Sequence, residues 1–154
     1  MRLLWYFAYG RNVNPVILVN RINASPLALH RGLLPGYRLE FTKTPASPQG
    51  IGYATIKPAT KEWVEGVLYL LTGNQLRILD RHEGVPEHYT RGSINVWDID
   101  VGCWVKAVTY IATRTNPKLK PSRSYIECIL EGARLVHLSR EWILRLEEFL
   151  REAI

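Results

Sequence analysis

The chain has 154 residues, 47% hydrophobic and 22% charged, which are ordinary values for a globular protein that builds its core without disulfide bonds. No stretch approaches the roughly 20 apolar residues of a membrane-spanning helix, and residues 3–8 are too short for a signal-peptide core, so no membrane association is expected. The net charge of +6 could indicate an anionic partner, but the basic residues are scattered and no nucleic-acid-binding module is recognisable. No nucleic-acid partner is therefore expected.

The cysteines and histidines do not indicate a metal site. Cys103 and Cys128 lie far apart, fit no CxxC pattern and are expected to be plain buried thiols. The histidines show no zinc-ligand spacing, and His82 and His88 are interpreted as structural or exposed. Two unpaired thiols make a reducing cytoplasm the default location.

The N-terminal stretch predicts a strand, a turn and a helix in close succession. Residues 3–8 form an apolar, aromatic run of strand character that ends at Gly10. Asn14 is a preferred N-cap and Pro15 suits the first helical position, which predicts a helix over residues 14–22. A strand, a glycine turn and a helix start often form a small anion site, because the first N–H groups of a helix have no intrahelical partners. The alternative is an ordinary turn after a buried strand.

The middle of the chain is predicted to form mostly strands. Residues 27–34 and 37–42 predict a strand pair about the turn dipeptide Pro35-Gly36, and the proline-containing residues 43–49 predict a loop. Residues 51–57 and 63–71 predict two further strands because they are rich in β-branched and aromatic residues.

Helices become frequent towards the C-terminus. Thr72 is expected to cap a helix over about residues 74–81, and a hairpin with its loop near residues 98–102 follows, from strands 89–98 and 103–112. Ser122 and Ser139 are expected to cap two amphipathic helices, the first running to His137. This order predicts an α+β fold in one domain, residues 1–154, with a largely antiparallel sheet that can close into a barrel.

Glu83 is the most informative polar residue. It lies seven and four residues after Leu76 and Leu79, which places a carboxylate on the inward face of the predicted helix. Gly84 is a usual helix terminator, and both the helix C-terminus and an apolar wall would raise the pKa of a carboxyl group there. Such a group can accept a proton near neutral pH. The alternative is a surface glutamate at a frayed helix end, paired with Arg81 or Arg91.

Three blocks of sequence follow one another along the chain. The first is Tyr6-Phe7-Ala8-Tyr9-Gly10-Arg11-Asn12. The second joins Gly66-Val67-Leu68-Tyr69 to Leu79-Asp80-x-x-Glu83-Gly84-x-Pro86-x-x-Tyr89-x-Arg91, and the third comprises Tyr125 and Gly132-Ala133. The blocks resemble the signatures of the gamma-glutamyl cyclotransferase family, including its gamma-glutamylamine cyclotransferase and plant avirulence-induced-gene relatives, and the first is similar to that family's Y-F-A-Y-G-S-N. Each block alone is weak, but the ordered set is fairly specific.

The resemblance implies a small, mixed β-barrel with surrounding helices and a central cavity. It also implies an acyltransferase-type reaction of glutathione metabolism, in which a gamma-glutamyl amide becomes 5-oxoproline and a free amine without a cofactor. Glu83 matches the catalytic glutamate. The substrate-binding residues implied are Tyr6, Phe7, Ala8, Tyr9, Gly10, Arg11, Asn12 and Tyr125.

One residue departs from the signature. Arg11 stands where the family has serine, which preserves a backbone amide contact but replaces a hydroxyl with a fixed positive charge. Arg11 could point to solvent, narrow the pocket or favour an extra carboxylate on the substrate. The second hypothesis is therefore a non-catalytic member of the same fold that binds a small anion or a protein partner. The leaving amine stays open, and the C-terminal helices could support a homodimer without requiring one.

Overall fold

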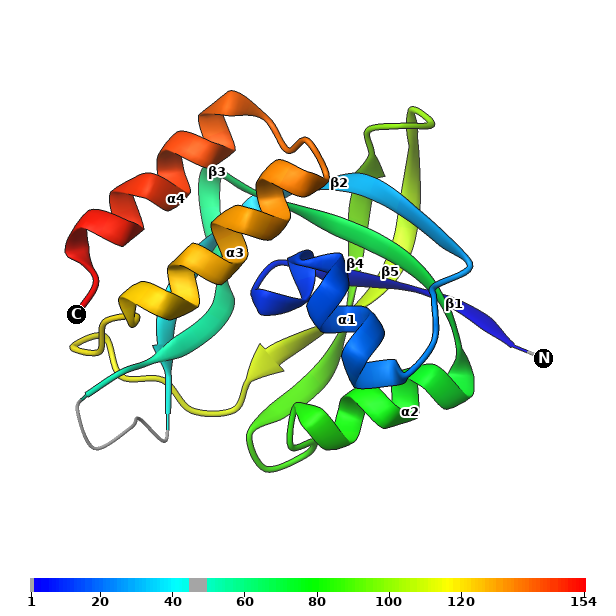
Figure 1. Cartoon of the computed structure of the whole chain (residues 1–154), viewed down its shortest axis with the longest axis horizontal. Coiled ribbons are helices and arrows are strands. Elements are labelled where there is room, and N and C mark those ends of the chain that lie inside the picture. Colours follow the sequence, from blue (N-terminus) through cyan, green and yellow to red (C-terminus); the bar gives the residue numbers. More distant parts are fainter. Residues whose placement is uncertain (1, 45–49) are drawn as a thin grey trace.

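In the computed structural model, which describes residues 2–44 and 50–154, five strands close into a barrel (Figure 1). The strands are β1 (Leu3–Ala8), β2 (Ala28–Lys43), β3 (Tyr53–Thr72), β4 (Tyr89–Asp98) and β5 (Cys103–Ala112). Their order around the barrel is β1-β3-β2-β4-β5, and β1 closes it by pairing in parallel with β5, whereas the other neighbours are antiparallel. The expected mixed, largely antiparallel barrel of an α+β fold is confirmed.

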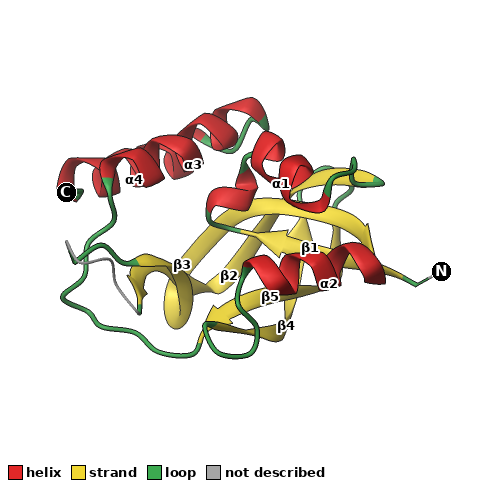
Figure 2. Ribbon diagram, turned by 60° about the horizontal axis from the view of Figure 1, so that its bottom comes forward, coloured by secondary structure: helices red, strands yellow, loops and turns green. Residues whose placement is uncertain are grey.

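The helices are capped where the sequence places polar N-caps. After the short 3-10 helix η1 (Arg11–Val13), these are α1 (Pro15–Ile22), α2 (Gly73–His82), α3 (Arg123–Leu135) and α4 (Arg140–Glu152). A side-chain oxygen accepts a backbone N–H at each of the four α-helix N-caps: Asn14, Thr72, Ser122 and Ser139. Figure 2 shows α3 and α4 together on one side of the strands and α2 on another.

The predicted break at Pro35-Gly36 is wrong, because β2 continues through it as one strand. Gly36 has a φ of 80°, and the pairing register with β3 shifts between Pro35 and Tyr37, so the dipeptide forms a bulge. Leu34 pairs with Val64 before the bulge and Arg38 pairs with Lys57 after it. Since β3 is equally continuous, the four short strands predicted are two long ones.

The structure tests only the start of the predicted loop over residues 43–49. Lys43 is the last residue of β2 rather than a loop residue, and residues 45–49 of the prediction lie outside the described residues. The side chains of Leu39, Phe41, Thr42 and Lys43 are all buried, and the pairing register with β3 shifts between Glu40 and Lys43. Lys43 therefore occupies a buried position at the end of β2.

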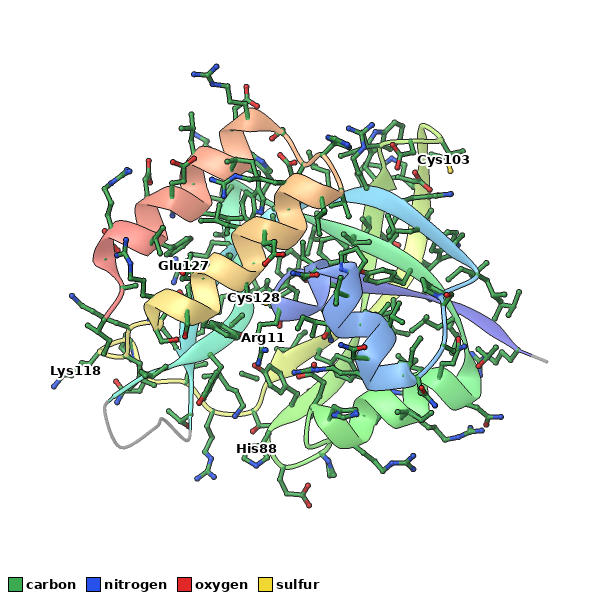
Figure 3. The ribbon with its side chains drawn as sticks, viewed as in Figure 1. Arg11, His88, Cys103, Lys118, Glu127 and Cys128 are labelled. Carbon is green, nitrogen blue, oxygen red and sulfur yellow. The ribbon has the colours of Figure 1, made fainter. Side chains whose placement is uncertain are left out.

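The barrel shares one hydrophobic cluster with α3 and α4. The cluster includes Val67 of β3, Ile126 of α3 and Trp142 of α4. Cys103 is exposed at the tip of the β4–β5 hairpin, where little of the core can cover it, so the expected buried thiol is wrong at this position (Figure 3). Among the described residues, no helix combines the length and apolar character that crossing a bilayer requires.

Candidate active site

A cavity of about 480 Å³ opens where the end of β1, the C-terminus of α2 and the start of α3 meet. Its wall is unusually rich in tyrosine and basic side chains. It is lined by Tyr6, Tyr9, Gly10, Arg11, Asn12, Arg21, Lys43, Tyr53, Ala54, Arg81, His82, Glu83, Gly84, His88, Tyr89, Tyr110 and Tyr125. The cavity thus brings together Glu83, Tyr125 and most of the first sequence block.

The turn after β1 is held in place by contacts from two other elements. The Tyr69 hydroxyl, fully buried on β3, donates a 2.7 Å hydrogen bond to the backbone carbonyl of Asn12. From α3, Gly132 approaches so closely that a Cβ there would lie 2.4 Å from the Asn14 Cα. Both Tyr69 and Gly132 belong to the sequence blocks quoted above, so the three blocks meet at this turn.

Backbone donors at the turn face no partner of their own. In η1 the N–H groups of Val13 and Asn14 bond to the carbonyls of Gly10 and Arg11, at 3.0 Å each. The N–H groups of Arg11 and Asn12 precede those bonds, and within the described part of the chain no backbone acceptor meets them. Two backbone donors are therefore available beside the cavity.

Glu83 is the C-cap residue of α2, and its side chain is 15% exposed. Its Oε1 accepts a hydrogen bond from Asn12 Nδ2 at 3.2 Å and lies 3.3 Å from the Arg21 guanidinium. Burial raises the pKa of the Glu83 carboxyl above its usual range, while Arg21, Asn12 and Lys43 act in the opposite direction. The result is a carboxyl group that is shielded from water yet bonded directly to the turn.

The sequence suggested Arg91 as one possible ion-pair partner of Glu83, but in the structure the two residues have other partners. Arg91 forms a two-pronged ion pair with Asp80, with its Nη2 2.7 Å from the carboxylate. Arg21, on α1, had no sequence signal that linked it to Glu83, because 62 residues separate the two. Their contact depends on the packing of α1 against α2.

Tyr6 and Tyr125 reach the cavity from β1 and α3. Asn12 Nδ2 also donates to the Tyr6 hydroxyl, at 2.9 Å, so the one amide bridges Tyr6 and Glu83. The Tyr125 hydroxyl accepts the Ala54 N–H at 3.2 Å, which leaves its own proton free to donate. Burial raises the pKa of Tyr125 to about 12, so this hydroxyl stays protonated at neutral pH.

The structure separates Phe7 and Ala8 from the other residues of the first block. Their side chains are 0% and 1% exposed in the core, and neither lines the cavity. Strand alternation accounts for Phe7, whose ring points away from the face of Tyr6 and lies against Gly66, whereas Ala8 is buried at the end of β1 where it pairs with Val67. These two predicted substrate contacts are therefore corrected to core positions.

Several cationic lining residues were not anticipated as site residues. His88, labelled in Figure 3, reaches the cavity from the loop before β4, whereas Arg11 on η1 was already among the residues that the resemblance implied. His82 and Arg81 line it from the end of α2, and Lys43 from the end of β2. Extending the predicted strand 37–42 by one residue would have placed Lys43 on the inward face with Leu39 and Phe41.

Metal ligands are not grouped in the part of the chain that the structure describes: no three His, Cys, Asp or Glu side chains there could hold an ion together. The chemistry that the cavity itself offers is proton transfer at Glu83, hydrogen-bond donation from backbone and tyrosine groups, and attraction of anions.

Solved structures with the same fold include a gamma-glutamyl cyclotransferase. A solved structure of a gamma-glutamyl cyclotransferase superposes with a TM-score of 0.82 at 24% identity, over 95% of this chain and 87% of that one. The human uncharacterized protein loc79017 gives a TM-score of 0.83 at 25% identity, over 96% of this chain and 88% of its own. The fold is thus the gamma-glutamyl cyclotransferase fold.

The family follows from the sequence match. The chain belongs to the AIG2-like family, whose model matches residues 63–146, more than half of the chain. A gamma-glutamyl cyclotransferase of Aspergillus oryzae, aclK, is 23% identical over 94% of this chain, which spans 60% of the length of that relative. The resemblance drawn from the three blocks is confirmed.

Proposed function

We propose that this chain is a gamma-glutamyl cyclotransferase that converts a gamma-glutamyl amide into 5-oxoproline and a free amine, without a cofactor. The observation that carries the proposal is that Glu83 and the Gly10–Asn12 turn line one cavity, with Asn12 bonded to the carboxylate. The names of its relatives support the reaction class. Formally this is acyl transfer to the substrate's own amine, a step of the kind found in glutathione metabolism.

Glu83 acts as the proton carrier. The α-amino group of the substrate must lose a proton before its nitrogen attacks the γ-carbonyl carbon. Glu83 accepts that proton, the new ring C–N bond forms, and the C–N bond to the leaving amine breaks as the proton passes to that amine. The raised pKa of Glu83 supports this role, because a base whose pKa lies nearer neutrality both accepts and returns a proton readily.

The turn and the tyrosines position the substrate. The free N–H groups of Arg11 and Asn12 bind the glutamyl α-carboxylate or the oxyanion that develops on the γ-carbonyl. Tyr125 donates its free proton to the substrate, and Tyr6 lines the cavity. Because attack is intramolecular, much of the rate enhancement comes from selecting the folded conformer of the glutamyl chain.

The test is 5-oxoproline release by wild type and Glu83→Gln from a panel of gamma-glutamyl amino acids, gamma-glutamyl amines and glutathione. Loss of the proton acceptor is expected to lower kcat by roughly 10²–10⁴-fold. Glu87→Gln changes an exposed carboxylate four residues away and is the matched control, expected to keep wild-type rates. Undiminished release by Glu83→Gln would contradict the proposal.

The alternative function is a non-catalytic receptor for a small anion. The observation that favours it is the charge of the cavity wall, where six basic or histidine side chains face the single carboxylate of Glu83. Thermal-shift titration with gamma-glutamyl compounds separates the two functions. Tight binding without turnover of any panel member would favour the receptor, and turnover excludes it.

A further inference from the structure

Lys43 is a buried lysine that forms no ion pair among the described residues, and Glu83 acts on its charge only from beyond ion-pair distance. The residue is 6% exposed, and its Nζ lies 5.6 Å and 5.3 Å from the ring centroids of Tyr53 and Tyr89. Its hydrogen-bond partner is His88 Nδ1, at 3.1 Å. Among the described residues, no carboxylate lies within ion-pair distance of Lys43, and residues 45–49 contain no acidic residue that could supply one.

A buried, unpaired ammonium is costly, because two aromatic faces and one imidazole replace the hydration of the charge only in part. Every other cation on the cavity wall escapes this cost in some way. Arg21 has Glu83 at 3.3 Å, and Arg11, Arg81 and His82 are exposed to water. Lys43 is therefore the lining cation that gains most when an anion enters the cavity.

His88 fixes the direction of the Lys43 ammonium. A lysine ammonium can only donate, so His88 Nδ1 accepts from it and the ring proton lies on Nε2, on the far side of the ring. The ammonium has three N–H groups, and the bond to His88 uses one of them. The others can form charge-assisted hydrogen bonds with a carboxylate.

The geometry points to a carboxylate on the leaving amine. We propose that Lys43, oriented by His88, forms a subsite for that carboxylate, so that the substrates are gamma-glutamyl amino acids or peptides rather than simple gamma-glutamyl amines. The glutamyl end is already provided for by the η1 donors and by Tyr125, whose ring is 5.6 Å from Tyr53. Since Tyr53 contacts both Tyr125 and Lys43, the Lys43 subsite adjoins the glutamyl end. This inference rests on the proposed function.

The experiment compares two substrates that differ only by the carboxylate: gamma-glutamyl-alanine and gamma-glutamyl-ethylamine. Wild type is expected to favour the alanine compound in kcat/KM by roughly tenfold or more, the usual size of a charge-assisted bond. Lys43→Met should remove this preference, mainly through KM for the alanine compound, when both enzymes are compared at a pH above the acid limb, since Lys43 also lowers the pKa of Glu83. Lys106→Met, which removes an exposed lysine of β5, is the control and should keep the preference.

Binding of 5-oxoproline distinguishes the two ends of the substrate. The product keeps the glutamyl carboxylate but not the leaving group, so its Kd should be equal for wild type and Lys43→Met. A tenfold weaker Kd in the variant would assign Lys43 to the glutamyl end and overturn the inference. Equal losses for both substrates, or no preference in wild type, would overturn it as well.

Failure of the proposed function gives a different result. If wild type turns over neither compound, the cyclotransferase proposal is wrong, and the subsite is then decided by calorimetric titration of the same two compounds. Tighter binding of gamma-glutamyl-alanine to wild type, lost in Lys43→Met, supports the subsite. Equal binding of both compounds, or none, contradicts it.

Discussion

Glu83 combines two opposed influences within one side chain. Burial favours its neutral form, whereas the Arg21 guanidinium at 3.3 Å and the Asn12 amide at 3.2 Å favour the carboxylate. Burial is the larger effect, so the pKa is raised. Arg21 thereby limits how far the pKa rises and keeps enough carboxylate to accept a proton.

Arg21→Met removes this limit and is predicted to shift the acid limb of the kcat/KM profile to higher pH. The sign follows because the active form is the carboxylate, and without Arg21 a higher pH is needed to reach it. The pH dependence of kcat/KM for a gamma-glutamyl substrate measures the shift. Arg151→Met, at the exposed end of α4, is the control and should leave the limb in place. An unmoved or lowered limb in Arg21→Met would contradict this account of Glu83.

Removing Arg21 should also change how the free energy of unfolding depends on pH. A carboxyl whose folded pKa lies above its unfolded pKa contributes stability below the unfolded value and loses it as pH rises through the folded value. The free energy of unfolding of Arg21→Met should therefore fall over a wider pH range than that of wild type. Urea titrations at a series of pH values measure this.

At the scale of elements, the turn depends on how closely α3 approaches it. The side-chain amide of Asn14 donates to the carbonyl of Cys128 on α3 at 3.3 Å, and Gly132 one helical turn later lies against the Asn14 backbone. α4 is fixed to the barrel separately, because buried Glu65 accepts hydrogen bonds from both the N–H and the hydroxyl of Ser139.

Two helix glycines should respond oppositely to alanine. Gly132→Ala places a Cβ 2.4 Å from the Asn14 Cα, so α3 must shift, at an expected cost of about 1–3 kcal/mol. Gly73→Ala at the start of α2 meets nothing within 4 Å and is expected to gain about 0.4–1 kcal/mol from the less flexible unfolded chain. Urea denaturation measures both. Two changes of the same sign would show that the α3 contact does not limit packing here.

Across the whole molecule, one hydrophobic cluster joins the barrel to all four α-helices. We therefore propose that residues 1–154 form a single domain that unfolds in one step. Near- and far-ultraviolet circular dichroism should give coincident urea transitions, and the calorimetric and van't Hoff enthalpies should agree. A separate early loss of helix signal would indicate that α3 and α4 unfold apart from the barrel.

Local signals were enough to predict most elements. The N-caps Asn14, Thr72, Ser122 and Ser139 each start a helix, since capping involves residues two or three positions apart. The strands 89–98 and 103–112 were also predicted with the bounds observed. The turn predicted at Pro35-Gly36 is wrong because a non-local interaction decides the structure there. Pairing of β2 with β3 on both sides of the bulge overrides the local turn preference.

The sequence by itself determined the order of strands and helices, the inward position of Glu83 and the likeness to gamma-glutamyl cyclotransferases, because each rests on neighbouring residues or on residue order. Only the tertiary structure decided which distant side chains meet. Barrel closure brings Lys43 and His88 to the cavity of Glu83, and packing of α1 on α2 brings Arg21 to the same carboxylate. These contacts join residues dozens of positions apart, and no local pattern encodes such a distance.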